Sequence, residues 1–260
     1  MDTIGLVVAM SQEIHPFLRY ARGWKRTPIG KFQGYRFELS GRDCLLVRSG
    51  IGLERAMLAT RALLAEVRPQ LLISFGIGGG TEADLHVGDV VLGRESCQLD
   101  ATGVSQFRPL VLLTENAQKA ISQVLQPRGA SVVLGTIVTT PGSQNLQPRP
   151  ELLHPVLDME TAGVAKVAEE MGIALLALRG LSDTPQEPIP FDIEAFTSGK
   201  ARPRLRRISG TLLQHPGIIF KLIRLSQNTE KAAQNAALAL VTALSQPLPG
   251  EIKTGRVSSS

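Results

Sequence analysis

The sequence predicts an α/β fold, a three-layer sandwich with a central, mostly parallel mixed sheet and a helical C-terminal extension. Two patterns predict it. Short apolar runs, typical of buried strands, alternate with segments of helical spacing up to residue 183, and from Pro203 onward the spacing is helical alone. A chain of 260 residues with 43% hydrophobic side chains is long enough to bury one large core.

The predicted elements follow one another in a regular order. A buried strand at residues 3–9 comes first, and a hairpin then turns at Gly41. Pro69 ends the first long helix, and the apolar runs beyond it are bounded by turn residues. We expect strands at residues 3–9, 35–39, 44–49, 71–75, 89–93 and 131–139, and helices at residues 53–67 and 114–125. A strand–helix–strand unit follows at residues 156–183, with Gly172 ending its helix.

Composition excludes several classes of protein. Cys44 and Cys97 are too few for a disulfide framework or a cysteine zinc site, and the four histidines are scattered, so we expect no metal and no cofactor. The N-terminus lacks a signal peptide pattern, and no apolar run approaches the roughly 20 residues of a membrane span. The expected location is therefore the cytoplasm.

The net charge of +5 is concentrated near the C-terminus. The segment between residues 195 and 229 has no acidic residue but seven basic ones: Lys200, Arg202, Arg204, Arg206, Arg207, Lys221 and Arg224. No aromatic residues are interleaved with the basic run, so nucleic-acid binding is not expected. Apolar residues follow at 218–225, and a basic amphipathic segment of this kind suits an anionic membrane surface, a helix packed on the core, or a dimer interface.

Two apolar runs each deliver a carboxylate to their C-terminal end. Glu160 follows residues 156–159, and Asp183 ends residues 178–183. If both strands are parallel, these side chains meet at one rim of the sheet, where ligands bind in open α/β sheets. Two converging carboxylates suit cleavage of a glycosidic bond. On spacing alone, it is equally possible that Glu160 is only a helix N-terminal acid and Asp183 a turn residue.

A glycine-rich segment, residues 76–80, is expected to form a loop after the strand at 71–75. It does not fit a dinucleotide fingerprint, because it follows several strands and has the spacing G-x-G-G-G. Its backbone N–H groups could approach a small polar ligand closely. A plain tight turn explains the segment equally well.

Five motifs occur in the order seen in the purine nucleoside phosphorylase family. The sequence most resembles the methylthioadenosine/S-adenosylhomocysteine nucleosidases of that family, over roughly residues 3–196. The motifs are Ala9-Met10-Ser11-Gln12-Glu13, Ser49-Gly50-Ile51-Gly52, Gly76-Ile77-Gly78-Gly79, Asp158-Met159-Glu160-Thr161-Ala162 and Ser182-Asp183. A shorter match, Leu212-Leu213-Gln214-His215-Pro216-Gly217 after the arginine-rich segment, resembles the hopanoid-associated phosphorylases.

The resemblance implies a role for each motif. Asp183 would protonate the purine at N7, for which its pKa must be raised, and Ser182 would orient it. Glu160 would accept hydrogen bonds from the ribose hydroxyls, and Glu13 would activate water. The other residues implied to bind substrate are Met159 on the ribose face, Met10 and Ile51 along the sugar and its 5′ substituent, Phe191 beside that substituent, Asp158, and Gly76, Ile77 and Gly78 in the glycine segment.

Some positions depart from the family pattern. Ser74 and Ile77 stand where phosphorylases hold phosphate with Arg and Ser, so a conventional phosphate site is in doubt. Asp158 replaces a Glu and is one methylene shorter. The segment at 139–144 lacks the aromatic expected over the base, so adenine rests on resemblance. The residues favour water as the nucleophile, whereas the name of the hopanoid-associated subgroup favours phosphate as a co-substrate.

The sequence thus predicts an enzyme that releases adenine from a purine nucleoside. The hopanoid resemblance favours adenosylhopane as substrate and a peripheral location at the inner face of the membrane. A soluble methylthioadenosine/S-adenosylhomocysteine-type nucleosidase and a non-catalytic, membrane-associated nucleoside-binding scaffold are the alternatives. We expect a catalytic domain at residues 1–200, a basic helical extension of it at 201–246 and a disordered tail at 247–260. A homo-oligomer is expected, with a dimer favoured by analogy.

Overall fold

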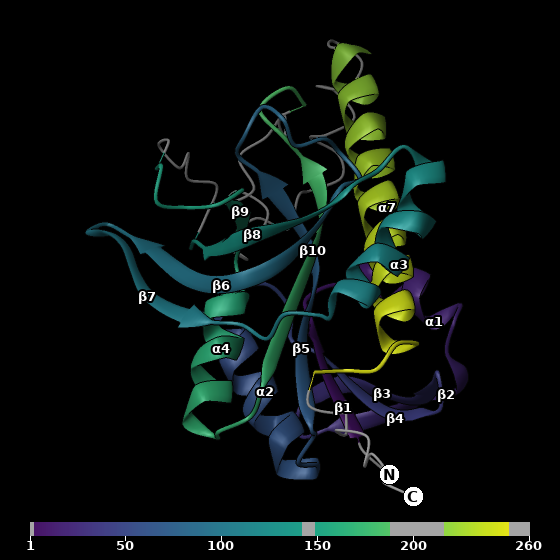
Figure 1. Cartoon of the computed structure of the whole chain (residues 1–260). Coiled ribbons are helices and arrows are strands. Elements are labelled where there is room, and N and C mark those ends of the chain that lie inside the picture. Colours follow the sequence, from purple (N-terminus) through teal and green to yellow (C-terminus); the bar gives the residue numbers. More distant parts are fainter. Residues whose placement is uncertain (1–2, 142–148, 188–215, 250–260) are drawn as a thin grey trace, which may run out of the picture.

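The computed structural model describes residues 3–141, 149–187 and 216–249, and for residues 216–225 it describes the backbone only. One mixed sheet carries all the strands of this part of the chain (Figure 1). The strands are β1 (Thr3–Val8), β2 (Arg22–Ile29), β3 (Phe32–Leu39), β4 (Arg42–Arg48), β5 (Leu71–Gly80), β6 (Val90–Asp100), β7 (Gly103–Pro109), β8 (Val132–Thr139), β9 (Val156–Asp158) and β10 (Leu175–Asp183). The helices are α1 (Ser11–Leu18), α2 (Leu53–Glu66), α3 (Glu115–Leu125), α4 (Thr161–Glu170) and α7 (Pro216–Leu244).

The core of the sheet is parallel and its margin is antiparallel. Strands β4, β1, β5 and β10 are parallel neighbours, and β3 and β2 continue the sheet beyond β4 as an antiparallel meander. On the other side, β5 pairs with β10, β10 with β6, β6 with β8, β8 with β9, and β9 returns to β5. These pairings close five strands into a ring, and β5 joins that ring to the parallel sheet.

Helices cover both faces of the sheet, which confirms the predicted three-layer α/β architecture (Figure 1). Helices α1, α3 and α7 pack on one face, where Phe17, Ile121 and Leu240 are fully buried. Helices α2 and α4 pack on the other face through residues such as Leu63 and Val164. Burial of two apolar layers against one sheet is the main driving force for this arrangement.

The C-terminal half of α7 belongs to this core. Ala232, Ala236 and Leu240 are buried, and Asn235 donates to the carbonyl of Gly88 over 2.7 Å. The predicted tail begins within the folded part, because Leu248 is also buried. The basic segment 200–207 and the side chains of 218–225 lie outside the described residues. Among the described residues, no helix has the length and apolar character needed to cross a membrane.

Two predicted features of the sheet are wrong, and strand β2 was not predicted. Residues 76–80 form no loop, because β5 continues to Gly80. The strands at the two ends of the 156–183 unit were predicted to be parallel, with their C-terminal ends at one edge of the sheet. Instead, β9 runs antiparallel to β5, whereas β10 runs parallel to it. Strand β2 was missed because its first five residues are all exposed and show no alternation, so only pairing with β3 holds it extended.

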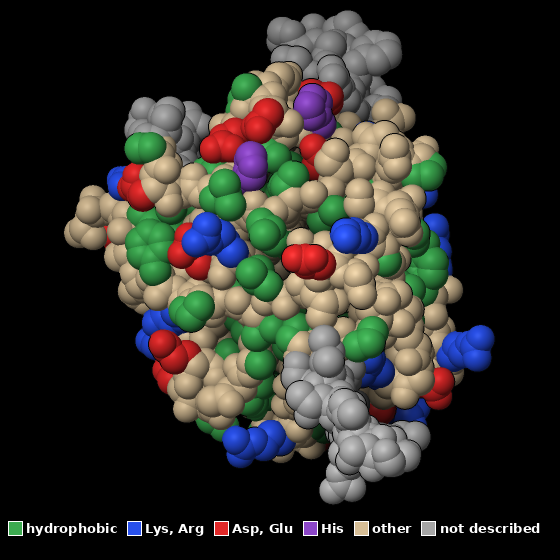
Figure 2. Space-filling view, in the orientation of Figure 1, with side chains coloured by type: hydrophobic (Ala, Val, Ile, Leu, Met, Phe, Trp, Pro, Cys, Tyr) green, Lys and Arg blue, Asp and Glu red, His purple; other side chains and the backbone are tan. Residues whose placement is uncertain are grey.

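The surface carries charges of both signs. On the face drawn in Figure 2, the described Lys and Arg side chains are interspersed with Asp and Glu side chains. Such mixing is typical of an ordinary soluble surface and by itself indicates no ligand.

Candidate active site

The second half of β5 organises the candidate site. Glu13, in the first turn of α1, sends its carboxylate to this strand, where Oε1 accepts from the backbone N–H of Ile77 over 3.0 Å. Its other oxygen accepts from the N–H of Met10 over 2.7 Å and caps the helix. The Glu13 side chain is buried, and this burial raises its pKa. Glu13 is therefore not the exposed helix acid that its position would otherwise suggest.

The glycines of β5 allow carboxylates to approach the strand. A Cβ on Gly76 would lie 2.5 Å from Glu13 Oε1, and a Cβ on Gly79 would lie 2.6 Å from Asp183 Oδ2. Neither glycine has the positive φ of a tight turn. These two glycines thus allow side chains to approach the strand closely, and the predicted tight turn is not present. Close approach of this backbone to a ligand stays a prediction.

Glu160 lies at the N-terminus of α4, but its carboxylate does not cap that helix. Oε1 instead accepts from the backbone N–H of Gly52 over 2.8 Å, across to the start of α2. Burial, reinforced by the nearby Asp158 carboxylate, raises the pKa of Glu160 to about 8. The Glu13 carboxylate also raises it, which places Glu13 and Glu160 within electrostatic range of one another.

Asp183 ends β10, next to Gly79 of β5. The hydroxyl of Ser182 donates to Asp183 Oδ1 over 2.7 Å, which holds the carboxyl in one orientation. Burial raises the pKa of Asp183, and the Ser182 hydrogen bond opposes that shift. Among the described residues, Glu13, Glu160 and Asp183 form no ion pair with Lys or Arg and accept hydrogen bonds from neutral donors. The positive charge of Arg179 partly opposes the rise in the pKa of Glu13 and Glu160.

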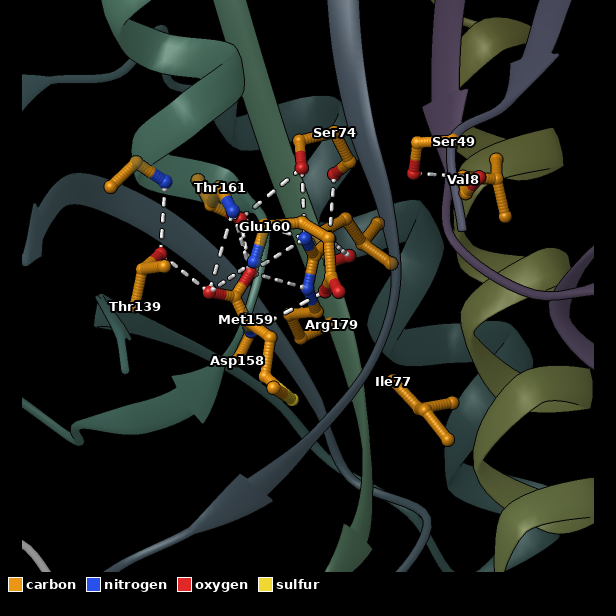
Figure 3. Close-up of polar contacts among 12 residues, drawn as sticks. Val8, Ser49, Ser74, Ile77, Thr139, Asp158, Met159, Glu160, Thr161 and Arg179 are labelled. Carbon is orange, nitrogen blue, oxygen red and sulfur yellow. Dashed lines mark hydrogen bonds and ion pairs between the residues drawn. The ribbon is translucent and has the colours of Figure 1, made fainter. Parts of the chain in front are cut away.

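Asp158, unlike these three carboxylates, lies in a network of polar contacts with Arg179, Thr139 and Thr161 (Figure 3). Its Oδ2 accepts from Nη2 of Arg179 over 2.7 Å, and both side chains are almost fully buried. Thr139 donates to Oδ1 over 2.6 Å, and Thr161 donates to Oδ2. The remaining Arg179 donors bind Oγ of Ser74 at 2.8 Å and two backbone carbonyls. Asp158 also accepts from the backbone N–H groups of Glu160 and Thr161 and so fixes the start of α4; direct substrate binding by Asp158 stays a prediction.

The other predicted residues divide into three groups. Met10, Ile51, Met159 and Ser182 lie on segments that carry or contact the three carboxylates, beside Glu13, Gly52, Glu160 and Asp183 respectively. Gly76, Ile77 and Gly78 lie within β5, and the N–H of Ile77 is already bonded to Glu13. Phe191 lies outside the described residues.

Sequence reasoning missed Arg179. The signal was present, because an Arg within the apolar run 175–183 must find a carboxylate if the strand is buried. Asp158 was the available partner, but its position was read as a substrate contact. Ser74 was read as a lost phosphate ligand, whereas its hydroxyl contacts Arg179 and Thr161 in the buried network.

The fold also brings together three potential metal ligands that are distant in sequence. Nδ1 of His154 is 2.7 Å from Oε2 of Glu82, and Asp84 completes a group whose ligand atoms lie within 4.8 Å of one another. Spacing could not have shown this, since Glu82 and His154 are 72 residues apart. The His154–Glu82 contact has the length of a direct hydrogen bond, which accounts for the pair without a cation.

Comparison with known proteins now identifies the family. Residues 3–214 match the model of the Phosphorylase superfamily. The chain belongs to this superfamily. A curated relative, the 5′-methylthioadenosine/S-adenosylhomocysteine nucleosidase of Shewanella oneidensis, is 26% identical over 209 residues, which cover 74% of this chain and 89% of the relative.

Two solved structures share the fold of this chain. The 5′-methylthioadenosine/S-adenosylhomocysteine nucleosidase of Neisseria meningitidis, in complex with methylthio-immucillin-A, matches with a TM-score of 0.66 and 22% identity, covering 94% of this chain and 99% of that one. The futalosine hydrolase of Helicobacter pylori matches with a TM-score of 0.64 and 19% identity, covering 93% and 97%. At these identities the likeness establishes the fold, and the chemistry must come from the residues.

Proposed function

We propose that this protein is a nucleosidase that hydrolyses the N-glycosidic bond of an adenine nucleoside. Asp183 is the general acid that protonates the purine, Glu160 holds the ribose hydroxyls, and Glu13 activates the attacking water. The observation that carries the proposal is the burial of Asp183 without a cationic partner among the described residues, which raises the pKa of its carboxyl and so favours the protonated form that a general acid needs. The curated relatives supply adenine as the base.

The roles of Glu13 and Glu160 follow from their surroundings. A base is stronger when its pKa is raised, and burial raises the pKa of Glu13 while two backbone N–H groups fix its oxygens. Glu160 carries a proton more readily than an ordinary glutamate, so positive charge developing on the sugar would favour its ionised form. Glu160 therefore binds the transition state more tightly than the ground state.

Water is the proposed nucleophile because the positions of the phosphate ligands are otherwise engaged. Ser74 is buried and bonded to Arg179, and Ile77 offers no side-chain donor. The reaction needs no cofactor. Incubation with methylthioadenosine in phosphate-free buffer should release adenine and a free 5-methylthio-sugar. A sugar 1-phosphate that forms only when phosphate is added would refute hydrolysis.

Adenosylhopane is a second candidate substrate, which the hopanoid-like segment and the basic residues 200–207 favour. Such a substrate would have to be drawn from a bilayer, so anionic lipid should bind this protein. Co-sedimentation with liposomes should then rise with anionic lipid and fall with salt. Replacing Arg204, Arg206 and Arg207 by Gln should reduce liposome binding and leave cleavage of methylthioadenosine intact. Absence of binding would leave the soluble nucleosidase as the function.

A further inference from the structure

A basic cavity of about 490 Å³ lies beside the candidate site, and none of the roles assigned above uses its charge. It opens where β1 and β4 end and where α1 and α2 begin, and the turn between β2 and β3 closes one side. The described residues that line it are Ala9, Met10, Ser11, Gln12, Lys31, Phe32, Gln33, Arg48, Gly50, Ile51 and Arg55. Three of them are cations and none is acidic.

These three cations have no carboxylate partner among the described residues. The guanidinium of Arg48 donates to Oγ of Ser11 over 2.7 Å, and Nε of Arg55 donates to the carbonyl of Ser49 over 3.1 Å. Nζ of Lys31 lies 5.6 Å from the centre of the Phe32 ring. By contrast, Arg36, Arg61, Arg108, Arg149 and Arg179 all pair with carboxylates. Neutral oxygens thus orient two guanidinium groups while leaving further N–H donors and the full positive charge available.

The cavity is continuous with the candidate site through two of its lining residues. Met10 directly precedes α1, and its N–H is bound by Glu13. Ile51 lies between Gly50, over which the guanidinium of Arg55 packs, and Gly52, whose N–H is bound by Glu160. Met10 and Ile51 are the residues assigned to the sugar and its 5′ substituent, so the cations lie beyond the 5′ end of a bound nucleoside.

We propose that Lys31, Arg48 and Arg55 form a subsite for an oxyanion at the 5′ end of the nucleoside substrate, a phosphate ester or a carboxylate. This inference rests on the proposed function. Planar guanidinium groups match the paired oxygens of either oxyanion, and a cation offsets the charge that a neutral cavity could not hold. A hydrocarbon in the same cavity would remove three cations from water without a counter-ion, so the subsite favours an anionic 5′ group over a hopane.

Substrate comparison tests the subsite directly. Adenine release is measured for methylthioadenosine, which is neutral at the 5′ end, for S-adenosylhomocysteine, which carries a carboxylate, and for adenosine 5′-phosphate. We expect adenosine 5′-phosphate, or S-adenosylhomocysteine with its carboxylate beside an ammonium group, to exceed the neutral methylthioadenosine in kcat/KM. Lys31→Gln and Arg48→Gln should each reduce that preference about tenfold, the value of one charge-assisted hydrogen bond. Lys25→Gln, an exposed cation of the same hairpin outside the cavity, should leave the preference unchanged.

Binding separates failure of the subsite from failure of the proposed function. Calorimetry with adenosine 5′-phosphate and with inorganic phosphate reports the oxyanion site whether or not cleavage occurs. Cation-dependent binding of the nucleotide without adenine release would support the subsite and refute the nucleosidase. Cleavage of methylthioadenosine with equal preference in Lys25→Gln, Lys31→Gln and Arg48→Gln would overturn the subsite alone. Cation-dependent stimulation by inorganic phosphate, with a sugar 1-phosphate product, would assign the oxyanion to free phosphate and overturn the 5′ assignment.

Discussion

Two kinds of buried carboxylate occur in the candidate site, on Asp158 and on Glu13, Glu160 and Asp183. Asp158 is bonded to the guanidinium of Arg179, to two threonine hydroxyls and to the N–H of Thr161. Within the part of the chain that the structure describes, Glu13, Glu160 and Asp183 accept only from backbone N–H groups and a serine hydroxyl. The first is neutralised by a permanent cation, whereas burial raises the pKa of each of the other three.

The difference between paired and unpaired carboxylates explains how one small region can be both rigid and reactive. A fully paired carboxylate has no free lone pair to offer and holds the backbone between β9 and α4 in place. An unpaired buried carboxylate costs stability, but it can take up or release a proton near neutral pH. We infer that the Asp158–Arg179 pair stabilises the fold and that the unpaired carboxylates perform the chemistry.

Breaking the ion pair should have the largest effect on stability. Arg179→Met leaves the buried Asp158 charge without a counter-ion, so the free energy of unfolding should fall by about 3–5 kcal/mol. The exposed pair of Arg61 and Glu170 is the matched control, since Arg61→Met should cost less than about 1 kcal/mol. Urea denaturation measures both. Adding Asp158→Asn to Arg179→Met removes the stranded charge and should recover part of the loss; equal costs for Arg179→Met and Arg61→Met would contradict the assignment.

Glu160→Gln should lower activity and raise the free energy of unfolding at alkaline pH. The native state holds the Glu160 proton up to about pH 8, whereas the unfolded chain releases it near 4.5, the ordinary pKa of a glutamate. The wild type therefore loses stability as the pH rises between these values. Gln does not titrate, so the variant should gain a few kcal/mol over wild type at the alkaline end and nothing at the acidic end. At the same time kcat should fall and KM should rise.

Thermal melts across that pH range, with Glu66→Gln as a surface control, measure the change in stability. A Glu160→Gln gain that is the same at every pH would show that packing, and not ionisation, explains it. Wild-type activity on 2′-deoxy and 3′-deoxy nucleosides checks the ribose contact, because loss of either hydroxyl should lower kcat if Glu160 holds them.

Removing the hydroxyl beside Asp183 should have the smallest effect. Ser182→Ala deletes one hydrogen bond to the acid, worth about 1 kcal/mol, so kcat should fall by less than about tenfold. The Ser182 hydrogen bond also lowers the pKa of Asp183, so its loss should move the alkaline limb of the pH–rate profile to higher pH. An unchanged profile with reduced kcat would assign Ser182 to orientation alone.

Local patterns predicted the layers of the fold better than the pairing of its strands. The apolar runs at residues 3–9 and 71–75 mark buried strands because their side chains face helices on both sides of the sheet. Residues 76–80 were misread because glycine usually marks a turn, whereas here it admits Glu13 and Asp183 beside the strand. Strand β9 runs antiparallel to β5 and parallel to β8. The direction of β9 depends on the connection after β8, and no local sequence pattern predicts that direction.

The residues of the candidate site could be predicted where a single sequence motif contains them. Asp183 and Glu160 each end an apolar run, and the family motifs named Glu13. The Asp158–Arg179 pair and the basic cavity were not predicted, because their members come from separate elements that only the tertiary structure brings together. Long-range electrostatics of this kind leave no periodic signal in a single sequence.

A leaving-group comparison tests the central claim, that unpaired Asp183 donates a proton. Adenine needs protonation to leave, whereas p-nitrophenolate does not, so cleavage of a p-nitrophenyl riboside should bypass a general acid. We predict that Asp183→Asn lowers kcat by about 10² or more for the adenine nucleoside and far less for the p-nitrophenyl riboside. Equal losses on the two substrates would contradict the account and leave Asp183 a role in binding or structure.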